Sequence, residues 1–226
     1  MKTKFAIGCL VQWYECDIIE EYVESLKDTI KNYDGEVIVD FTISTNEELE
    51  RCVSPTKKME CLEKIGSILL DFENVRFLKK LHTIADYRRE FNDKYCEQVD
   101  VLVWGESDML APKQMFTILD SLHQNISTPK YLATFGICKM WDDTWSPLEH
   151  LEFTNHKHSD DPNDWWGLNY VMDKKEMDGF NDKVEELMIT QIAPHKFNGC
   201  GLVISSEVIK SGVNIPRSVF FVHEDT

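Results

Sequence analysis

Short runs of apolar, often β-branched residues alternate along the chain with stretches whose apolar residues recur at helical spacing. The runs have the length of strands and show little alternation, as expected of strands that are buried on both faces of a sheet. They predict strands at residues 5–11, 37–43, 75–78, 99–104, 131–137, 202–205 and 219–222. Helical spacing is clearest at residues 17–30 and 84–95. We therefore expect an α/β fold with a mixed, mostly parallel sheet flanked by helices.

Local signals indicate where helices begin. Asp17, with Glu20 three residues later, has the spacing of a capping box, in which two side chains satisfy backbone N–H groups at the start of a helix. Pro55 and Pro112 each stand where a helix is expected to start, because proline fits the first helical turn without losing a hydrogen bond. These signals support the alternating order of strands and helices.

The length and composition fit a single domain. The 226 residues are 42% hydrophobic and 11% aromatic, which is enough for one well-packed core. Residues 139–182 are rich in Trp, Asp, His and Asn and have no clear period. We expect this segment to be a loop-rich insertion that shapes a pocket.

The strongly acidic composition narrows the classes of partner. Asp and Glu number 40 and Lys and Arg 24, which gives a formal net charge of −16. This charge disfavours non-specific binding to a nucleic-acid backbone. The seven cysteines form no Cys-x-x-Cys pair, so the sequence predicts neither a disulfide framework nor a zinc knuckle and favours reduced thiols in the cytoplasm. The apolar run at residues 5–11 is too short to span a membrane, so we expect no membrane span.

Carboxylates follow several of the predicted strands. In an open α/β sheet the ligand lies beyond the carboxyl ends of the strands, so these are the positions where chemistry is expected. Two acidic side chains one residue apart can direct oxygens at one hard cation, which in turn neutralises a diphosphate. A chain this acidic also places carboxylates in turns for solubility alone, and that interpretation stays open. The segments concerned are Tyr14-Glu15, Glu106-Ser107-Asp108 and Glu224-Asp225.

Beyond these local patterns, the chain resembles the inverting glycosyltransferase family two, whose members have the GT-A fold. Residues 5–15 look like the family's first strand and its Tyr-Asn-Glu turn, with Tyr14 followed here directly by Glu15. Residues 37–45 are similar to the second strand, where a family aspartate holds the nucleobase or ribose, and Asp40 is the matching residue. The resemblance implies a Rossmann-like nucleotide-diphospho-sugar transferase fold.

The most specific part of the resemblance is the segment 86–92 followed by 99–112, which looks like the family's Ala-Arg-Asn helix and the strand that bears its Asp-x-Asp metal motif. The first carboxylate of the motif is Glu106 here, which leaves Asp108 as the expected direct ligand of Mn²⁺ or Mg²⁺, with Glu106 assisting. The resemblance implies a nucleotide-sugar site formed by Trp13, Tyr14, Glu15, Asp40, Arg88, Arg89, Glu106 and Ser107.

Residues 197–205 and 220–225 resemble the acceptor-side strand of the family and the Glu-Asp motif that supplies its catalytic base. Asp225 matches the base and Glu224 its neighbour. The family continues into a helix beyond this point, so the resemblance implies a further C-terminal segment. Two adjacent tryptophans are candidates for stacking on the acceptor, although tryptophans also serve to anchor an insertion, and both interpretations stay open. These tryptophans are Trp165 and Trp166.

The resemblance also implies an activity, the inverting transfer of a sugar from a nucleoside-diphosphate sugar to an acceptor hydroxyl. Residues 1–112 would form the nucleotide-binding half and residues 113–226 the acceptor-side half, with Asp225 as general base. The acceptor stays open among a glycan, a lipid, a protein and a modified nucleic acid. Two other classes stay open: a nucleotidyltransferase, although no glycine-rich phosphate loop follows the first strand, and a catalytically inactive GT-A-like binding module.

Overall fold

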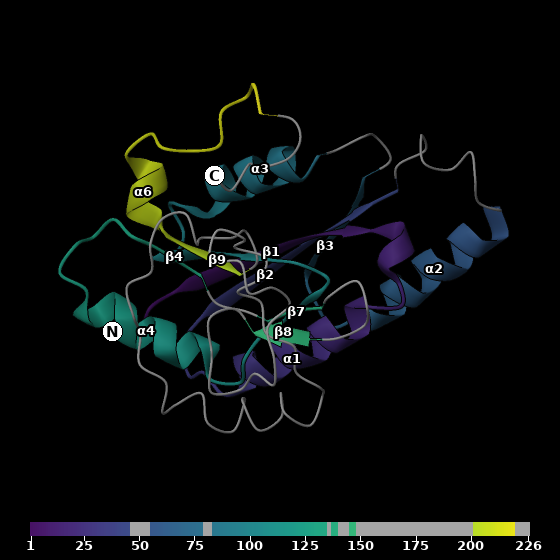
Figure 1. The fold of residues 1–226 in the computed structure, drawn as a ribbon, viewed down its shortest axis with the longest axis horizontal. Helices are drawn as coiled ribbons and strands as arrows, with labels where there is room; N and C mark the ends of the chain where they lie inside the picture. The colour runs from purple at the N-terminus through teal and green to yellow at the C-terminus, as the bar shows by residue number, and fades with distance from the viewer. Residues whose placement is uncertain (46–54, 79–82, 135–136, 140–144, 148–200, 220–226) are drawn as a thin grey trace, which may run out of the picture.

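A six-stranded sheet runs through the molecule and carries helices on both faces (Figure 1). The computed structural model describes residues 1–45, 55–78, 83–134, 137–139, 145–147 and 201–219. Across the sheet the strands are β3 (Asn74–Leu78), β2 (Val37–Ser44), β1 (Phe5–Gln12), β4 (Val101–Gly105), β9 (Leu202–Ser205) and β6 (Leu132–Thr134). The first four are parallel, whereas β9 runs antiparallel to both of its neighbours. This arrangement confirms the expected α/β class.

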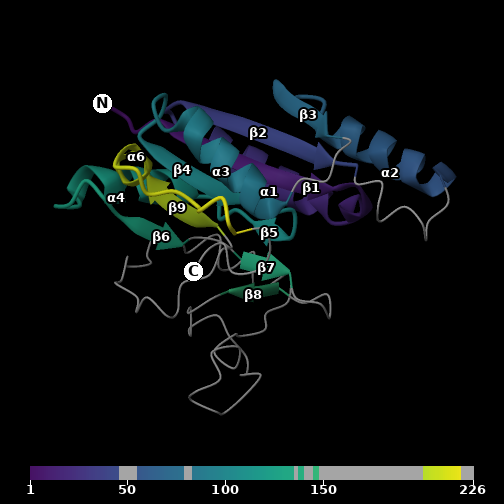
Figure 2. The same ribbon diagram turned by 90° about the horizontal axis from the view of Figure 1, so that it is seen from above.

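A second, smaller sheet lies to one side of the main sheet (Figure 2). Its antiparallel strands are β5 (Met109–Leu110), β7 (Ile137–Lys139) and β8 (Trp145–Pro147). The single strand predicted at residues 131–137 is therefore wrong, because β6 joins the main sheet and β7 joins the small one. The run contains Gly136, and a glycine inside a strand pattern is a signal of a break that the single-strand prediction passed over.

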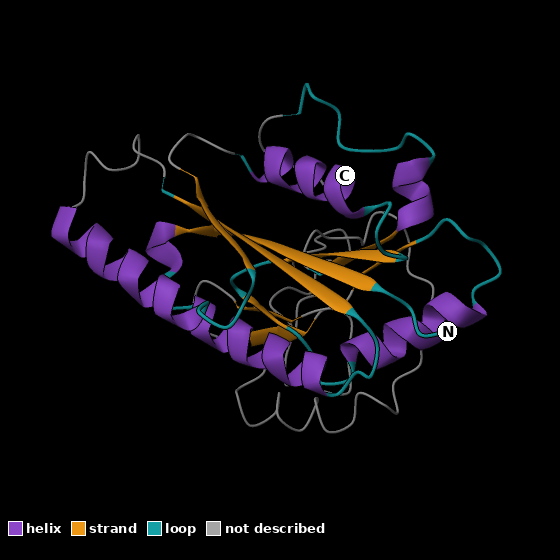
Figure 3. Cartoon of the chain, turned by 180° about the vertical axis from the view of Figure 1, so that it is seen from behind, coloured by secondary structure: helices purple, strands orange, loops and turns teal. Residues whose placement is uncertain are grey.

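The helices form one layer on each face of the main sheet (Figures 1 and 3). On one face lie α1 (Ile19–Lys31), α2 (Pro55–Ile68) and α4 (Met115–Asn125), and on the other lie α3 (Ile84–Tyr95) and α6 (Ser206–Lys210). The proline at position 55 begins α2 as predicted, whereas α4 begins at Met115, whose N–H donates to the carbonyl of Pro112 over 2.9 Å. No helix in the described ranges is long and apolar enough to cross a membrane.

Strand β1 shows why the sheet is covered on both faces. Ile7 and Cys9 are buried in the core beneath α1, α2 and α4, whereas Ala6 and Leu10 are buried in the core beneath α3 and α6. Successive side chains of a strand point to opposite faces, so an uninterrupted apolar run places apolar groups in both cores at once.

Helix α3 approaches β1 very closely, and Gly8 permits this approach. A Cβ atom added at Gly8 would lie 2.5 Å from Cδ2 of Phe91 and 2.6 Å from the hydroxyl of Tyr87, both of which are buried side chains of α3. Side chains that are packed on all sides move little without a cost in free energy. The residue at position 8 therefore limits how near α3 can lie to the sheet.

We predict that Gly8→Ala lowers the free energy of unfolding by about 1–3 kcal/mol, because the added methyl group overpacks the contact with α3. Gly66→Ala is the matched control, since a Cβ at this position of α2 meets no atom within 4 Å. Alanine is the better helix former, so this control is expected to gain up to about 1 kcal/mol. Urea denaturation of both variants measures the two changes, and equal values would contradict the packing argument.

Candidate active site

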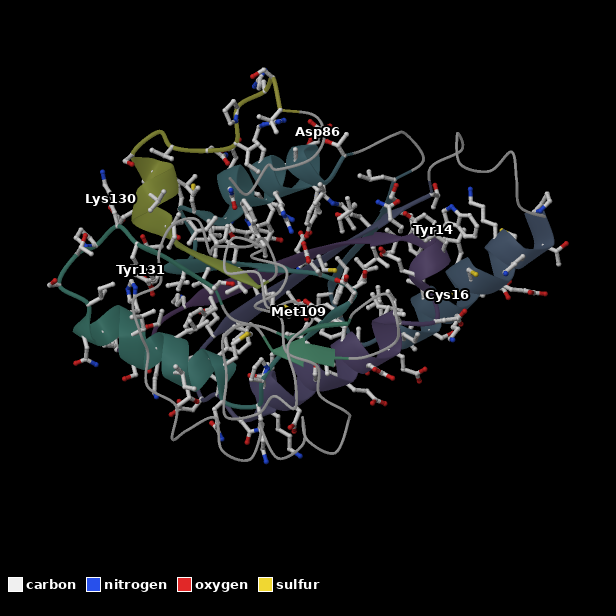
Figure 4. The ribbon with its side chains drawn as sticks, viewed as in Figure 1. Tyr14, Cys16, Asp86, Met109, Lys130 and Tyr131 are labelled. Atoms are coloured by element: carbon white, nitrogen blue, oxygen red, sulfur yellow. The ribbon has the colours of Figure 1, made fainter. Side chains whose placement is uncertain are left out.

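The turn η1 (Trp13–Glu15) carries three of the predicted residues just beyond the end of β1. The carboxylate of Glu15 accepts the backbone N–H of Gln12 over 2.6 Å, which closes the turn as a capping box. Trp13 is buried, whereas Tyr14 is 52% exposed (Figure 4). The turn therefore holds Glu15 against the backbone and leaves Tyr14 on the surface.

This capping box is not the one that the sequence predicted at Asp17 and Glu20. The residue before α1 is Ile18, which provides no side-chain cap, and Asp17 instead forms an ion pair of 2.8 Å with Lys64 of α2. The observed box between Gln12 and Glu15 has the same three-residue spacing, but glutamine is not among the residues that usually mark an N-cap, so the sequence contains no signal for it.

The segment Glu106-Ser107-Asp108 forms a second turn beside the first. The N–H of Met109 donates to the carbonyl of Glu106 over 3.0 Å and closes this turn after β4. The hydroxyl of Ser107 donates a hydrogen bond to the carboxylate of Glu15. Strands β1 and β4 are paired in parallel up to Gly105, so their carboxyl ends bring the two turns together.

Three carboxylates gather at these strand ends. Burial and the negative charges of Asp108 and Glu106 together raise the pKa of Glu15 to about 7, against the hydrogen bonds that Glu15 accepts. Burial also raises the pKa of Asp108. The same carboxylates, together with burial, raise the pKa of the Cys9 thiol beneath them well above its usual range. The site therefore disfavours its own negative charge, and a bound cation would relieve this repulsion.

Arg88 supplies one positive charge to the cluster from within the protein. Its guanidinium is 2% exposed, forms an ion pair with the carboxylate of Glu106 and lies 4.6 Å from the ring centre of Trp104. The ring nitrogen of Trp104 in turn donates to the side-chain oxygen of Asn92 over 2.9 Å. Arg88 therefore holds Glu106 in place, and the place in the nucleotide-sugar site that the resemblance implies for it stays a prediction.

Arg89 points to a different part of the protein. Its guanidinium donates to the carbonyls of Ile215 over 2.9 Å and Pro216 over 3.2 Å, and it forms an ion pair of 2.9 Å with Asp86. These contacts attach the segment after α6 to helix α3. The guanidinium of Arg89 is thus directed at the segment after α6, and its place in the nucleotide-sugar site stays a prediction.

Asp40 has a structural place in the middle of β2. Its carboxylate is 2% exposed, accepts the hydroxyl of Tyr95 over 2.7 Å and pairs with the amino group of Lys94 over 2.8 Å. A third contact of 3.3 Å comes from the hydroxyl of Tyr87. A buried carboxylate is stable only with such partners. Asp40 therefore binds α3 to the sheet, and the contact with the nucleobase or ribose that the resemblance implies for it stays a prediction.

Several predicted residues lie outside the described part of the chain. They are the expected base Asp225, its neighbour Glu224 and the acceptor candidates Trp165 and Trp166. Among the residues that the structure does describe, no three His, Cys, Asp or Glu side chains form a ready-made metal site. Mg²⁺ needs no such set, because it is commonly held by one or two carboxylates together with waters and substrate phosphates.

Comparison with known proteins identifies the fold. No protein-family model and no curated protein sequence matches the chain. Among solved structures, the mannosyltransferase PcManGT from Pyrobaculum calidifontis, in complex with GDP-Man and Mn²⁺, matches 97% of this chain and 49% of its own, with 10% identity and a TM-score of 0.51. The chain has a GT-A-like fold.

Two further solved structures are less similar to the chain. Residues 1–349 of TarS from S. aureus match 98% of this chain and 52% of their own, with 9% identity and a TM-score of 0.45. The 4-diphosphocytidyl-2C-methyl-D-erythritol synthase from Anaerococcus prevotii matches 92% of this chain and 74% of its own, with 14% identity and a TM-score of 0.42. The chain thus spans about half the length of PcManGT and of this TarS fragment.

We predict that the titration of Glu15 lowers the free energy of unfolding as the pH rises from about 4.5 to about 7. Burial raises its pKa from 4.5 to about 7, so within this window the folded protein keeps a proton that the unfolded chain has lost. The contribution of Glu15 to the free energy of unfolding is thus fully present below pH 4.5 and is lost as the pH rises through 7. A shift of this size corresponds to about 3 kcal/mol.

Glu15→Gln removes the titration but keeps an oxygen for the N–H of Gln12. We therefore expect the variant to lose much less stability than the wild type between pH 4.5 and pH 7.5. Urea denaturation of both proteins at several pH values measures this difference, and parallel curves would contradict the assigned pKa shift of Glu15.

The two acidic residues of the second turn are predicted to have opposite effects on stability. Glu106→Ala removes a partner of the buried guanidinium of Arg88 and is expected to destabilise the fold by about 3 kcal/mol. Asp108→Ala removes a carboxylate whose charged form is disfavoured by burial, so the variant is expected to be at least as stable as the wild type. Urea denaturation at pH 7 separates the two, and a larger loss for Asp108→Ala would contradict the assignment.

Proposed function

We propose that the chain transfers a sugar from a nucleoside-diphosphate sugar to an acceptor hydroxyl, with inversion and with the help of a divalent cation. The observation that supports this most is the mutual electrostatic repulsion of Glu15, Glu106 and Asp108, which follow the carboxyl ends of β1 and β4 in a GT-A-like sheet. Ligands of open α/β sheets bind at this edge.

The residues at this edge fit Mn²⁺ or Mg²⁺. Asp108 is the proposed direct ligand, because Arg88 already holds the carboxylate of Glu106, which leaves Glu106 an assisting role. Waters and the diphosphate would complete the oxygen ligands. When bound, such a cation stabilises the negative charge that develops on the leaving diphosphate.

The protein's own side chains have separate proposed roles around the donor. Tyr14, exposed on η1 and packed edge-on against Trp13 at 5.7 Å, offers a ring against which a nucleobase can stack. Glu15, protonated in part near neutral pH, limits the repulsion of the diphosphate. Ser107 keeps Glu15 in place through its hydrogen bond.

The acceptor-side chemistry is proposed for residues outside the described ranges. Asp225 would remove the proton of the acceptor hydroxyl as general base, with Glu224 beside it. Trp165 and Trp166 would contact the acceptor, whose class is a glycan, a lipid, a protein or a modified nucleic acid. We further propose that the protein acts in the cytoplasm.

A panel of nucleoside-diphosphate sugars tests the proposal with Mn²⁺ and with EDTA. We expect one donor to raise Tm in the presence of Mn²⁺, because a ligand that binds only the folded state stabilises it. The same donor should release its nucleoside diphosphate slowly by hydrolysis. Asp108→Ala should reduce this release at least about 100-fold. In other enzymes, the loss of one group that stabilises the charge of the transition state lowers kcat by about 10²–10³.

Asp28→Ala is the matched control, since it removes the same type of side chain from the exposed face of α1. This variant is expected to bind and hydrolyse the donor like the wild type. Donor binding without any turnover would favour a catalytically inactive binding module instead. Release of pyrophosphate from a nucleoside triphosphate and a sugar phosphate would favour a nucleotidyltransferase.

A further inference from the structure

Two cysteines that are distant in the sequence meet in the structure. Cys16 follows the turn η1 (Figure 4), and Cys61 lies in helix α2. Their sulfur atoms are 2.9 Å apart, and both side chains are buried, with exposed fractions of 5% and 7%. The site proposed for nucleotide-sugar binding does not use either thiol.

We propose that Cys16 and Cys61 form an oxidation site that closes into a reversible disulfide bond and fastens the turn η1 to helix α2. The S–S bond of a disulfide is about 2.0 Å long, so the two sulfur atoms need to approach each other by about 0.9 Å. The sequence gives these cysteines no motif, because the pairing is brought about by the packing of α2 against η1.

The surroundings of the pair do not suit a metal site, because structural zinc is held by four ligands. Within the described residues, no third His, Cys, Asp or Glu completes a metal site. Cys96 shows ordinary thiol packing by contrast, with its sulfur 3.8 Å from the backbone carbonyl of Asp93.

Hydrogen peroxide is a suitable oxidant because it is small enough to approach nearly buried thiols. The thiolate of one cysteine attacks a peroxide oxygen and breaks the O–O bond, which gives a sulfenic acid and one water once the thiol proton is included. The second thiolate then attacks the sulfenic sulfur and releases a second water. The two thiols lose two protons and two electrons in total, and the peroxide is reduced to two waters.

Burial sets the rate of this step. It raises the pKa of Cys16 to about 12, and the hydrogen bond with Cys61 contributes in the same direction. Because the thiolate is the reactive form, oxidation should be slower than that of an exposed thiol and faster at higher pH.

The disulfide would add a covalent link to a contact that already exists. The ion pair of 2.8 Å between Lys64 and Asp17 joins the same two elements. A bond between residues 16 and 61 also closes a long loop in the unfolded chain, which favours the folded state. The oxidised protein should therefore unfold at a higher temperature than the reduced protein, by about 5–10 °C.

Peptide mapping of the full-length chain under non-reducing conditions tests the proposal. The protein is reduced, freed of reductant, and treated with increasing hydrogen peroxide at pH 7 and pH 9. We expect a peptide pair linked through Cys16 and Cys61, formed faster at pH 9, together with a rise in Tm that dithiothreitol reverses. Neither should occur in Cys16→Ser or Cys61→Ser, whereas Cys96→Ser should behave like the wild type.

The wild-type map decides the outcome even where a serine variant folds poorly. Linkage of Cys16 or Cys61 to any other cysteine would overturn the proposal, as would their separate conversion to sulfinic acid. Persistence of both free thiols after prolonged treatment with excess peroxide at pH 9 would overturn it as well. Donor binding plays no part in these measurements, so they stand apart from the proposed transferase activity.

Discussion

The structure depends on two buried charges, Asp40 and Arg88, that connect helix α3 to the sheet. At one end of the helix Lys94 and Tyr95 satisfy the buried carboxylate of Asp40 in β2, and in the first half of the helix the guanidinium of Arg88 pairs with Glu106 after β4. A buried charge without a partner is costly, so both connections must be kept at once. Together they fix the position of α3 over three neighbouring strands.

The same constraint shapes the chemistry at the strand ends. Because Arg88 neutralises one carboxylate from inside the protein, Glu106 keeps a defined direction in a turn that would otherwise carry only repelling charges. Asp108 and Glu15 remain as groups whose ionisation is disfavoured by burial. At this edge of the sheet the carboxylates of Asp108 and Glu15 repel each other when they are ionised, which favours the binding of a cation together with a phosphorylated ligand.

The sequence was informative where the signal is local. Buried parallel strands show as apolar runs, and the turn at residues 106–108 could be located because it follows the most apolar of them. The direction of the polar side chains could not be read in this way. The partners of Asp40 lie 54 and 55 residues away, and Arg89 contacts carbonyls more than 120 residues away. Contacts of this kind depend on how helices dock, which no pattern of neighbouring residues encodes.

The pairing of β6 with β9 has a consequence for how such a protein can diversify. Thr134, where the chain leaves the main sheet, is paired directly with Leu202, where it re-enters. The two ends of the intervening segment are therefore adjacent whatever its length, and the entropy of closing a loop rises only slowly with the number of residues. An exchange of this segment leaves the register of the main sheet intact, provided that it keeps β7, which pairs with β5 directly after the turn at residues 106–108.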